Sequence, residues 1–124
     1  MPSRQAVEAL AAAIEAGRYV EAIREFYAEG ASMRENFGET RVGLDVLAAG
    51  EQAVMARFQS IAAERIGPAL IEGDQVASRW RFTFTHRSGA TTTLEEIAWQ
   101  RWEGEKVAEE TFFYDPAQMA PPPA

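Results

Sequence analysis

The sequence predicts a single α+β domain in which helices come first and a long antiparallel meander follows. Apolar residues recur at helical spacing in the first half of the chain and at a spacing of two in the second half. Helices that precede strands in this way pack on one face of an antiparallel sheet. The length of 124 residues suits one domain. We expect it to span residues 1–116, followed by a loose Pro-rich tail over residues 117–124.

Two amphipathic helices are expected at the N-terminus. The first begins after a capping Ser3, ends at Gly17, and places one apolar face at i, i+3, i+4 and i+7 spacing, made by Val7, Leu10, Ala11 and Ile14. The second repeats this spacing at Tyr19, Ala22, Ile23 and Phe26. Gly30 is expected to end it, because glycine favours helix C-termini.

A short strand and a third helix are expected next. The strand covers about residues 31–36, and the turn-rich stretch after it leads into a helix over about residues 44–58. The expected buried stripe of this helix is Leu47, Val54, Met55 and Phe58. Gly50 weakens the middle of the helix slightly.

The second half of the chain predicts three long strands joined by tight turns. Residues 76–86 alternate between a mostly aromatic face and a polar face, and Gly89 marks the hairpin that follows. Further strands are expected over residues 91–102 and 106–114, with a turn at residues 103–105. An earlier strand over about residues 63–72 is interrupted at Gly67-Pro68.

Composition excludes several classes of function. The net charge of −7 argues against nucleic-acid binding, and no apolar run is long enough to span a membrane. The chain has no cysteine and one histidine, His86, which excludes thiolate chemistry and a metal site built on several imidazoles. We therefore expect no metal. The sequence also lacks glycine-rich nucleotide-binding motifs, so we expect no cofactor. Cysteine usage fits a cytoplasmic protein.

Four segments together carry a family resemblance: AIEAG at 13–17, REFYAEGASMREN at 24–36, RVGLDVL at 41–47 and QRWEGEKVAEETFFYDP at 100–116. In their order and spacing, the chain resembles the SnoaL-like branch of the nuclear-transport-factor-2-like superfamily. The resemblance implies a cone-shaped fold, with three helices on a strongly curved antiparallel sheet that encloses a pocket for a small, mainly apolar molecule. It also implies a homodimer through the outer sheet face, where Ile97 and Trp99 fall.

The resemblance does not extend to the proton-transfer residues of the ketosteroid isomerases. Near the position of their catalytic Asp this chain has Asn36, and near their two oxyanion donors it has Leu10 and Ala98. Steroid isomerisation is therefore not expected.

Glu96, Glu110 and His86 are the candidate catalytic residues. A carboxyl group inside an aromatic pocket has a raised pKa, as a general acid or base requires. Each glutamate is one of an adjacent pair, with Glu95 and Glu109, so either pair member can face inward. The alternative is that the inward carboxylate pairs with an arginine, and that His86 lies at the rim of the sheet.

The remaining candidates are ligand-binding residues. Trp80, Phe82, Phe84, Ala98, Gln100 and Phe112 are expected to form the pocket wall. Asn36, Tyr27 and Tyr114 could hydrogen-bond a ligand oxygen, and Arg34 could hold an anion. Each has a structural alternative: a turn for Asn36, a protein partner for the tyrosines, an ion pair for Arg34, and core packing for the aromatic residues.

Two functions remain open at this point. The first is a cofactor-independent acid/base isomerase, cyclase or hydrolase, acting on a small apolar substrate with a carbonyl, epoxide or enolisable centre. The alternative is a non-catalytic protein that binds a small ligand in the same pocket. A third, weaker interpretation is docking of another protein on the outer sheet face.

Overall fold

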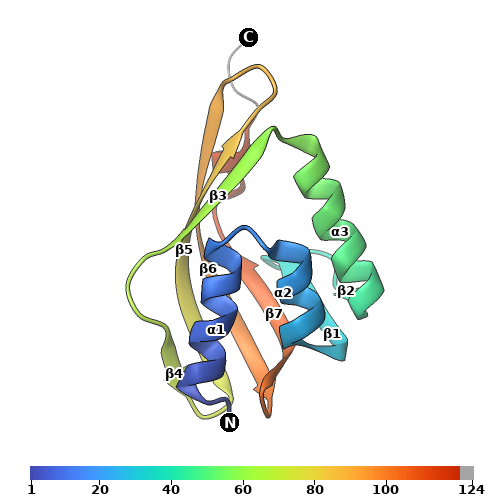
Figure 1. Cartoon of the computed structure of the whole chain (residues 1–124), viewed down its shortest axis with the longest axis vertical. Helices are drawn as coiled ribbons and strands as arrows, with labels where there is room; N and C mark the ends of the chain where they lie inside the picture. The colour runs from blue at the N-terminus through green and yellow to red at the C-terminus, as the bar shows by residue number, and fades with distance from the viewer. Residues whose placement is uncertain (121–124) are drawn as a thin grey trace.

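The computed structural model describes residues 1–120. Three helices, α1 (Arg4–Glu15), α2 (Tyr19–Phe26) and α3 (Leu44–Arg57), lie on one face of a seven-stranded sheet, as Figure 1 shows. The strand order is β2-β1-β7-β6-β5-β3, with β4 also paired to β5. The strands are β1 (Tyr27–Glu35), β2 (Arg41–Val42), β3 (Ser60–Arg65), β4 (Leu70–Glu72), β5 (Gln75–Thr85), β6 (Thr91–Glu103) and β7 (Lys106–Phe113).

The predicted α+β arrangement of helices on a curved sheet is confirmed, with one change to the sheet. Strands β3, β5, β6 and β7 pair antiparallel in series, but β1 pairs with β7 in parallel. The sheet is therefore mixed rather than purely antiparallel. The physical reason is that β1 and β7 are not joined by a hairpin, so no tight turn fixes their relative direction.

The element boundaries follow the predicted capping signals with two differences. Ser3 caps α1 as predicted, its Oγ accepting a hydrogen bond from the Ala6 N–H at 3.1 Å. The strand expected over residues 63–72 is two strands, separated at the predicted break. Helix α2 ends at Phe26 instead of Gly30, because Tyr27 is already extended and buried in β1.

The main core lies between α1, α2 and the middle of the sheet. Its most buried side chains include Trp102, Val76 and Val107. Helix α3 contributes less than its sequence predicts: Leu47 is buried, whereas the predicted core residue Met55 is 37% exposed. The outer part of α3 faces a hollow rather than a packed core.

The tail begins with an ordered turn. Pro116–Met119 forms a short 3-10 helix, η1, and the Gln118 side chain bonds both the N–H and the C=O of Glu95 on β6, at 2.9 and 3.0 Å. The side chain of Gln118 thus continues the hydrogen bonding of β6 beyond the end of β7. The prediction for residues 121–124 lies outside the described residues.

Within residues 1–120, no helix has the length and apolar character needed to cross a membrane.

Candidate functional site

The two glutamate pairs of β6 and β7 each turn one carboxyl inward. Glu96 is 8% exposed and Glu110 is 3% exposed. Their neighbours face outward, where Arg81 bonds Glu95 at 2.8 Å and Arg101 bonds Glu109 at 3.3 Å. The ion pairs are thus made by the outward glutamates, and within residues 1–120 neither inward carboxyl pairs with an arginine.

Glu110 is held by a chain of buried hydrogen bonds. The Tyr27 hydroxyl donates to Oε1 of Glu110, and Nε2 of Gln100 donates to Oε2 at 2.6 Å. The Trp102 indole N–H donates to Oε1 of Gln100 at 2.9 Å. Because an indole can only donate, this bond fixes the Gln100 amide with its NH₂ toward Glu110. Both oxygens of Glu110 therefore accept hydrogen bonds from the protein.

Two adjoining hollows lie between the helices and the sheet. The deeper one, of about 60 Å³, reaches Tyr27, Trp80, Ala98 and Glu110. The outer one, of about 330 Å³, is walled by aromatic and acidic residues that include Phe82, Phe84, Tyr114, Glu96 and Glu51. The hollows share the lining residues Tyr19, Met33, Glu51 and Phe112, so they meet along one boundary.

The proton affinity of Glu96 is strongly raised. Burial, together with the negative charges of Glu110, Glu35 and Glu51, raises its pKa from 4.5 to about 8. No group in the described part of the chain donates a hydrogen bond to its side chain. At neutral pH, Glu96 is therefore a protonated carboxyl that faces open space and can donate a hydrogen bond.

Glu110 is also buried, but two opposing effects act on its pKa. Burial raises its pKa to about 7, while the hydrogen bonds from Tyr27 and Gln100 favour the ionised form and oppose the shift. Burial also raises the pKa of Tyr27 well above its usual value, and the Glu110 charge adds to this. Tyr27 therefore remains a neutral donor to Glu110.

The structure adds Glu51 to the residues found from the sequence. Glu51 lies on α3, lines both hollows, and has its pKa raised by burial, with Arg41 opposing the shift. Arg41 itself bonds Glu35 at 3.5 Å, and Arg57 also lines the outer hollow. No sequence signal marks Glu51, because a glutamate on a helix is usually solvated.

Most of the predicted wall residues line the cavity. Trp80 and Ala98 line the deep hollow, Phe82, Phe84 and Tyr114 line the outer hollow, and Phe112 lines both. Gln100 lines neither hollow, and its contact is with Glu110.

The structure places three other candidates outside the cavity. His86 bonds the Thr92 hydroxyl through Nε2 at 2.6 Å and packs edge-on against Phe58 at the far end of the β5–β6 hairpin. Asn36 has a left-handed φ of 52°, and its Oδ1 accepts from the Tyr114 N–H at 3.0 Å, so it holds a turn. Arg34 donates to the Thr111 hydroxyl on the opposite face of the sheet.

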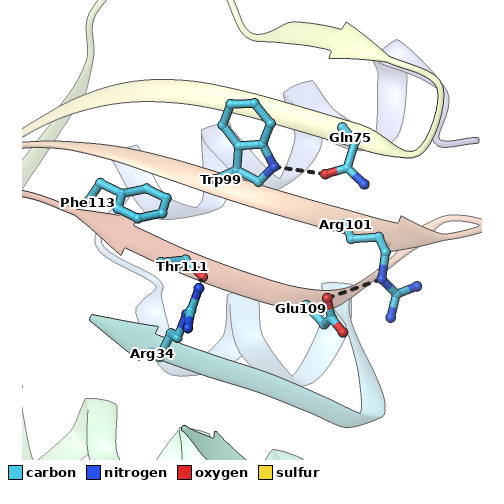
Figure 2. Close-up of a pocket in the computed structure, with 7 residues that line it drawn as sticks. All are labelled: Arg34, Gln75, Trp99, Arg101, Glu109, Thr111 and Phe113. Atoms are coloured by element: carbon cyan, nitrogen blue, oxygen red, sulfur yellow. Dashed lines mark hydrogen bonds and ion pairs between the residues drawn. The ribbon is translucent and has the colours of Figure 1, made fainter. Parts of the chain in front are cut away.

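That opposite face carries an open groove of about 480 Å³. Figure 2 shows the side chains of Trp99 and Phe113 standing on the sheet, with the helices behind it. Trp99 is 49% exposed and Ile97 is 43% exposed, while the Trp99 indole donates to Gln75 at 2.8 Å. The prediction that these two residues lie on the outer face agrees with their exposure.

Comparison with known proteins gives one family and many similar folds. A family model described as a SnoaL-like domain matches residues 7–110. No curated protein matches the sequence.

Three solved structures illustrate the similarity of fold. A Mesorhizobium loti protein described as a SnoaL-like polyketide cyclase is 22% identical, with a TM-score of 0.76 over 92% of this chain and 100% of its own. A Burkholderia pseudomallei protein of unknown function, described as similar to nuclear transport factor 2, is 17% identical, with a TM-score of 0.81 over 94% and 95%. A Catenulispora acidiphila protein with a ketosteroid isomerase-like fold, in complex with trimethylamine, is 19% identical, with a TM-score of 0.78 over 94% and 93%.

Proposed function

This chain belongs to the SnoaL-like domain family, and from that premise we propose that its cavity binds a small, mainly apolar molecule and catalyses proton transfer on it without a cofactor. The observation that carries the proposal is Glu96. Its carboxyl is buried, faces the outer hollow and has no hydrogen-bond donor in the described part of the chain. Glu96 is the proposed general acid.

The chemistry of the cavity favours a substrate with an oxygen acceptor on an apolar body. The outer hollow of about 330 Å³ suits a small organic molecule, and aromatic side chains form much of its wall. A carboxyl with a pKa of about 8 is protonated at neutral pH and can donate to a carbonyl or epoxide oxygen as charge develops on it. This is the proton transfer that an isomerase, cyclase or hydrolase requires. The description of the Mesorhizobium loti protein as a polyketide cyclase supports carbonyl chemistry.

Hydrogen exchange on a simple ketone tests this proposal. 2-Tetralone has an apolar ring, a carbonyl oxygen and enolisable hydrogens, and its deuteration in D₂O can be followed by proton NMR. We expect the wild-type protein to accelerate exchange and Glu96→Gln to lower that rate about 100-fold or more, because an amide cannot supply the proton. The matched control is Glu95→Gln, which changes the outward neighbour and should keep the wild-type rate. Exchange by Glu96→Gln at the wild-type rate would refute Glu96 as the acid.

A non-catalytic binding protein is the second candidate function. The deep hollow favours it, because Trp80 and Ala98 offer no proton and both Glu110 oxygens are bonded to protein donors. In that case 2-tetralone would bind, as seen by ligand-observed NMR, and its hydrogens would exchange no faster than in buffer.

We also propose that the protein forms a homodimer through its outer sheet face. We propose a cytoplasmic location as well, because a protein without cysteine has no disulfide that a reducing compartment would break. Trp99 and Ile97 are large apolar side chains beside a groove, and such surfaces are commonly covered. We expect Trp99→Glu to weaken the dimer about 30-fold or more, since buried tryptophans dominate interfaces. Sedimentation equilibrium measures this. Val46→Glu, on an exposed apolar residue of α3, is the control and should leave the dimer intact. A wild-type monomer at high concentration would contradict the proposal.

A further inference from the structure

We propose that Glu51 on α3 is a second proton-transfer group of the cavity, acting as the base that works with the acid Glu96. This inference rests on the proposed function, since it assigns a role in the same site. The two carboxyls come from opposite walls of the outer hollow, Glu51 from the helix and Glu96 from strand β6. Glu51 also lines the deep hollow, so a ligand that extends from one hollow into the other passes it.

The surroundings of Glu51 leave its carboxyl free to react. No side chain or backbone group within residues 1–120 donates a hydrogen bond to it. Arg41, whose positive charge acts on Glu51, makes its ion pair with Glu35 at 3.5 Å instead. Glu96, only 8% exposed and likewise without a donor in that part of the chain, faces the same space. Two carboxyls left unpaired in one cavity are costly in a folded protein, which favours a role with a ligand over a structural one.

The charges around the two carboxyls assign the acid and the base. The other titratable and charged groups that line the outer hollow come from α2, β1, β2, α3 and the residue after β7: Tyr19, Glu35, Arg41, Arg57 and Tyr114. Burial raises the pKa of both carboxyls. For Glu51, the charge of Arg41 opposes this rise and that of Glu35 adds to it, whereas for Glu96 only the carboxylates Glu110, Glu35 and Glu51 contribute, and all three add to it. When the pair carries one proton at neutral pH, Glu96 therefore holds it and Glu51 is the carboxylate.

The proposed step balances within this pair. The Glu51 carboxylate removes a hydrogen from the carbon next to a carbonyl as a proton. The C–H electron pair forms the C=C bond of an enol, and the carbonyl oxygen takes the proton of Glu96. Glu51 is then protonated and Glu96 ionised. Return of the proton from Glu51 to carbon and from the enol oxygen to Glu96 restores both groups, with no cofactor consumed.

The variant Glu51→Gln tests the inference on the same 2-tetralone exchange. We expect the rate at pH 7 to fall about 100-fold, and the acidic limb of the pH–rate profile, which reports ionisation of the base, to disappear while the alkaline limb remains. In Glu96→Gln the alkaline limb should disappear instead. Glu21→Gln, on the exposed surface of α2, is the control for a glutamate-to-glutamine change on a helix and should keep the wild-type profile.

The outcomes separate this inference from the proposed function. If Glu96→Gln loses exchange while Glu51→Gln keeps the wild-type rate and both limbs, the proposed function stands and Glu51 is not the base. If the wild-type protein does not accelerate exchange, the proposed function and the role of Glu51 as base are both refuted.

A second measurement needs no substrate. Carbon-13 NMR titration of labelled glutamate should show the pKa of Glu96 lower in Glu51→Gln than in the wild type, because a facing negative charge is gone. An unchanged Glu96 pKa would overturn the inference even if activity fell.

Discussion

Replacing Glu96 with glutamine is expected to stabilise the protein at pH 8 by on the order of 4 kcal/mol, although it removes the proposed acid. In the unfolded chain this glutamate has an ordinary pKa of 4.5, whereas in the folded protein burial raises the pKa to about 8. Between these values the folded state binds a proton that the unfolded state releases. The free energy of unfolding therefore falls as pH rises from about 4.5 toward 8. Glutamine is neutral throughout and carries no such penalty.

Urea unfolding at several pH values measures this effect. The difference in the free energy of unfolding between Glu96→Gln and the wild type should be small at pH 4.5 and grow up to pH 8. Glu95→Gln, which changes the outward neighbour that pairs with Arg81, is the matched control. The free energy of unfolding of Glu96→Gln should itself still fall somewhat as pH rises, because the pKa values of Glu110 and Glu51 are also raised. A constant difference across the range would mean that Glu96 is hydrated, which would remove the basis for its proposed role as acid.

The gain in stability expected for Glu96→Gln indicates that Glu96 has a functional role. A carboxyl that costs several kcal/mol near neutral pH is not kept for folding, because a glutamine of the same size would fold better. Glu110 differs, since hydrogen bonds from Tyr27 and Gln100 offset part of its cost. Of the two inward glutamates, Glu110 is thus hydrogen-bonded by the protein, whereas Glu96 is available to a ligand.

The sequence could predict which strand residues share a face, because alternation along a strand is strict. Glu96, Ala98 and Gln100 were expected to point the same way, and all are buried. Which face was inward could not be decided from Glu95 and Glu96 alone. The family resemblance placed Ile97 and Trp99 on the outer face, and their exposure of 43% and 49% agrees with that direction.

Helix α3 shows where sequence reasoning reached its limit. A core helix displays an apolar stripe, but this one forms the wall of a hollow, so its inward face mixes Leu47 with Glu51 and leaves Met55 exposed. Nothing in the spacing of Glu51 distinguishes it from a solvated glutamate. Only the lining of the hollow in the structure identifies Glu51 as a cavity residue.

The position of His86 and Asn36 outside the two hollows has a related reason. Each stands at the end of a strand, and the sequence gives the face of a strand residue but not how far the cavity extends along it. The turn at Asn36 uses the left-handed backbone that asparagine tolerates, and the side chain is used in holding Tyr114. The side chain of Asn36 thus has the turn-holding role that was its structural alternative.

Replacing Gln100 with leucine is expected to destabilise the protein by about 3–5 kcal/mol at pH 8, because it leaves two buried polar groups without partners. The Trp102 indole N–H loses its acceptor, and one Glu110 oxygen loses its donor. Leucine cannot replace either bond, and Trp102 is only 1% exposed, so water has little access. The cost should be smaller at pH 5, where Glu110 is protonated in the folded state and has less need of a donor.

The chain offers a matched control for this change on its outer face. Gln75 accepts a hydrogen bond from the Trp99 indole at 2.8 Å, as Gln100 does from Trp102, but at an exposed position. Gln75→Leu should cost less than about 1 kcal/mol, because water can replace the lost acceptor. Both variants are compared by urea unfolding, at protein concentrations low enough to keep the chain monomeric. Equal costs would mean that water also reaches the deep hollow, and Glu110 would then titrate as an ordinary exposed carboxyl. A cost confined to Gln100→Leu and rising with pH would show instead that Glu110 keeps its charge only through its protein donors.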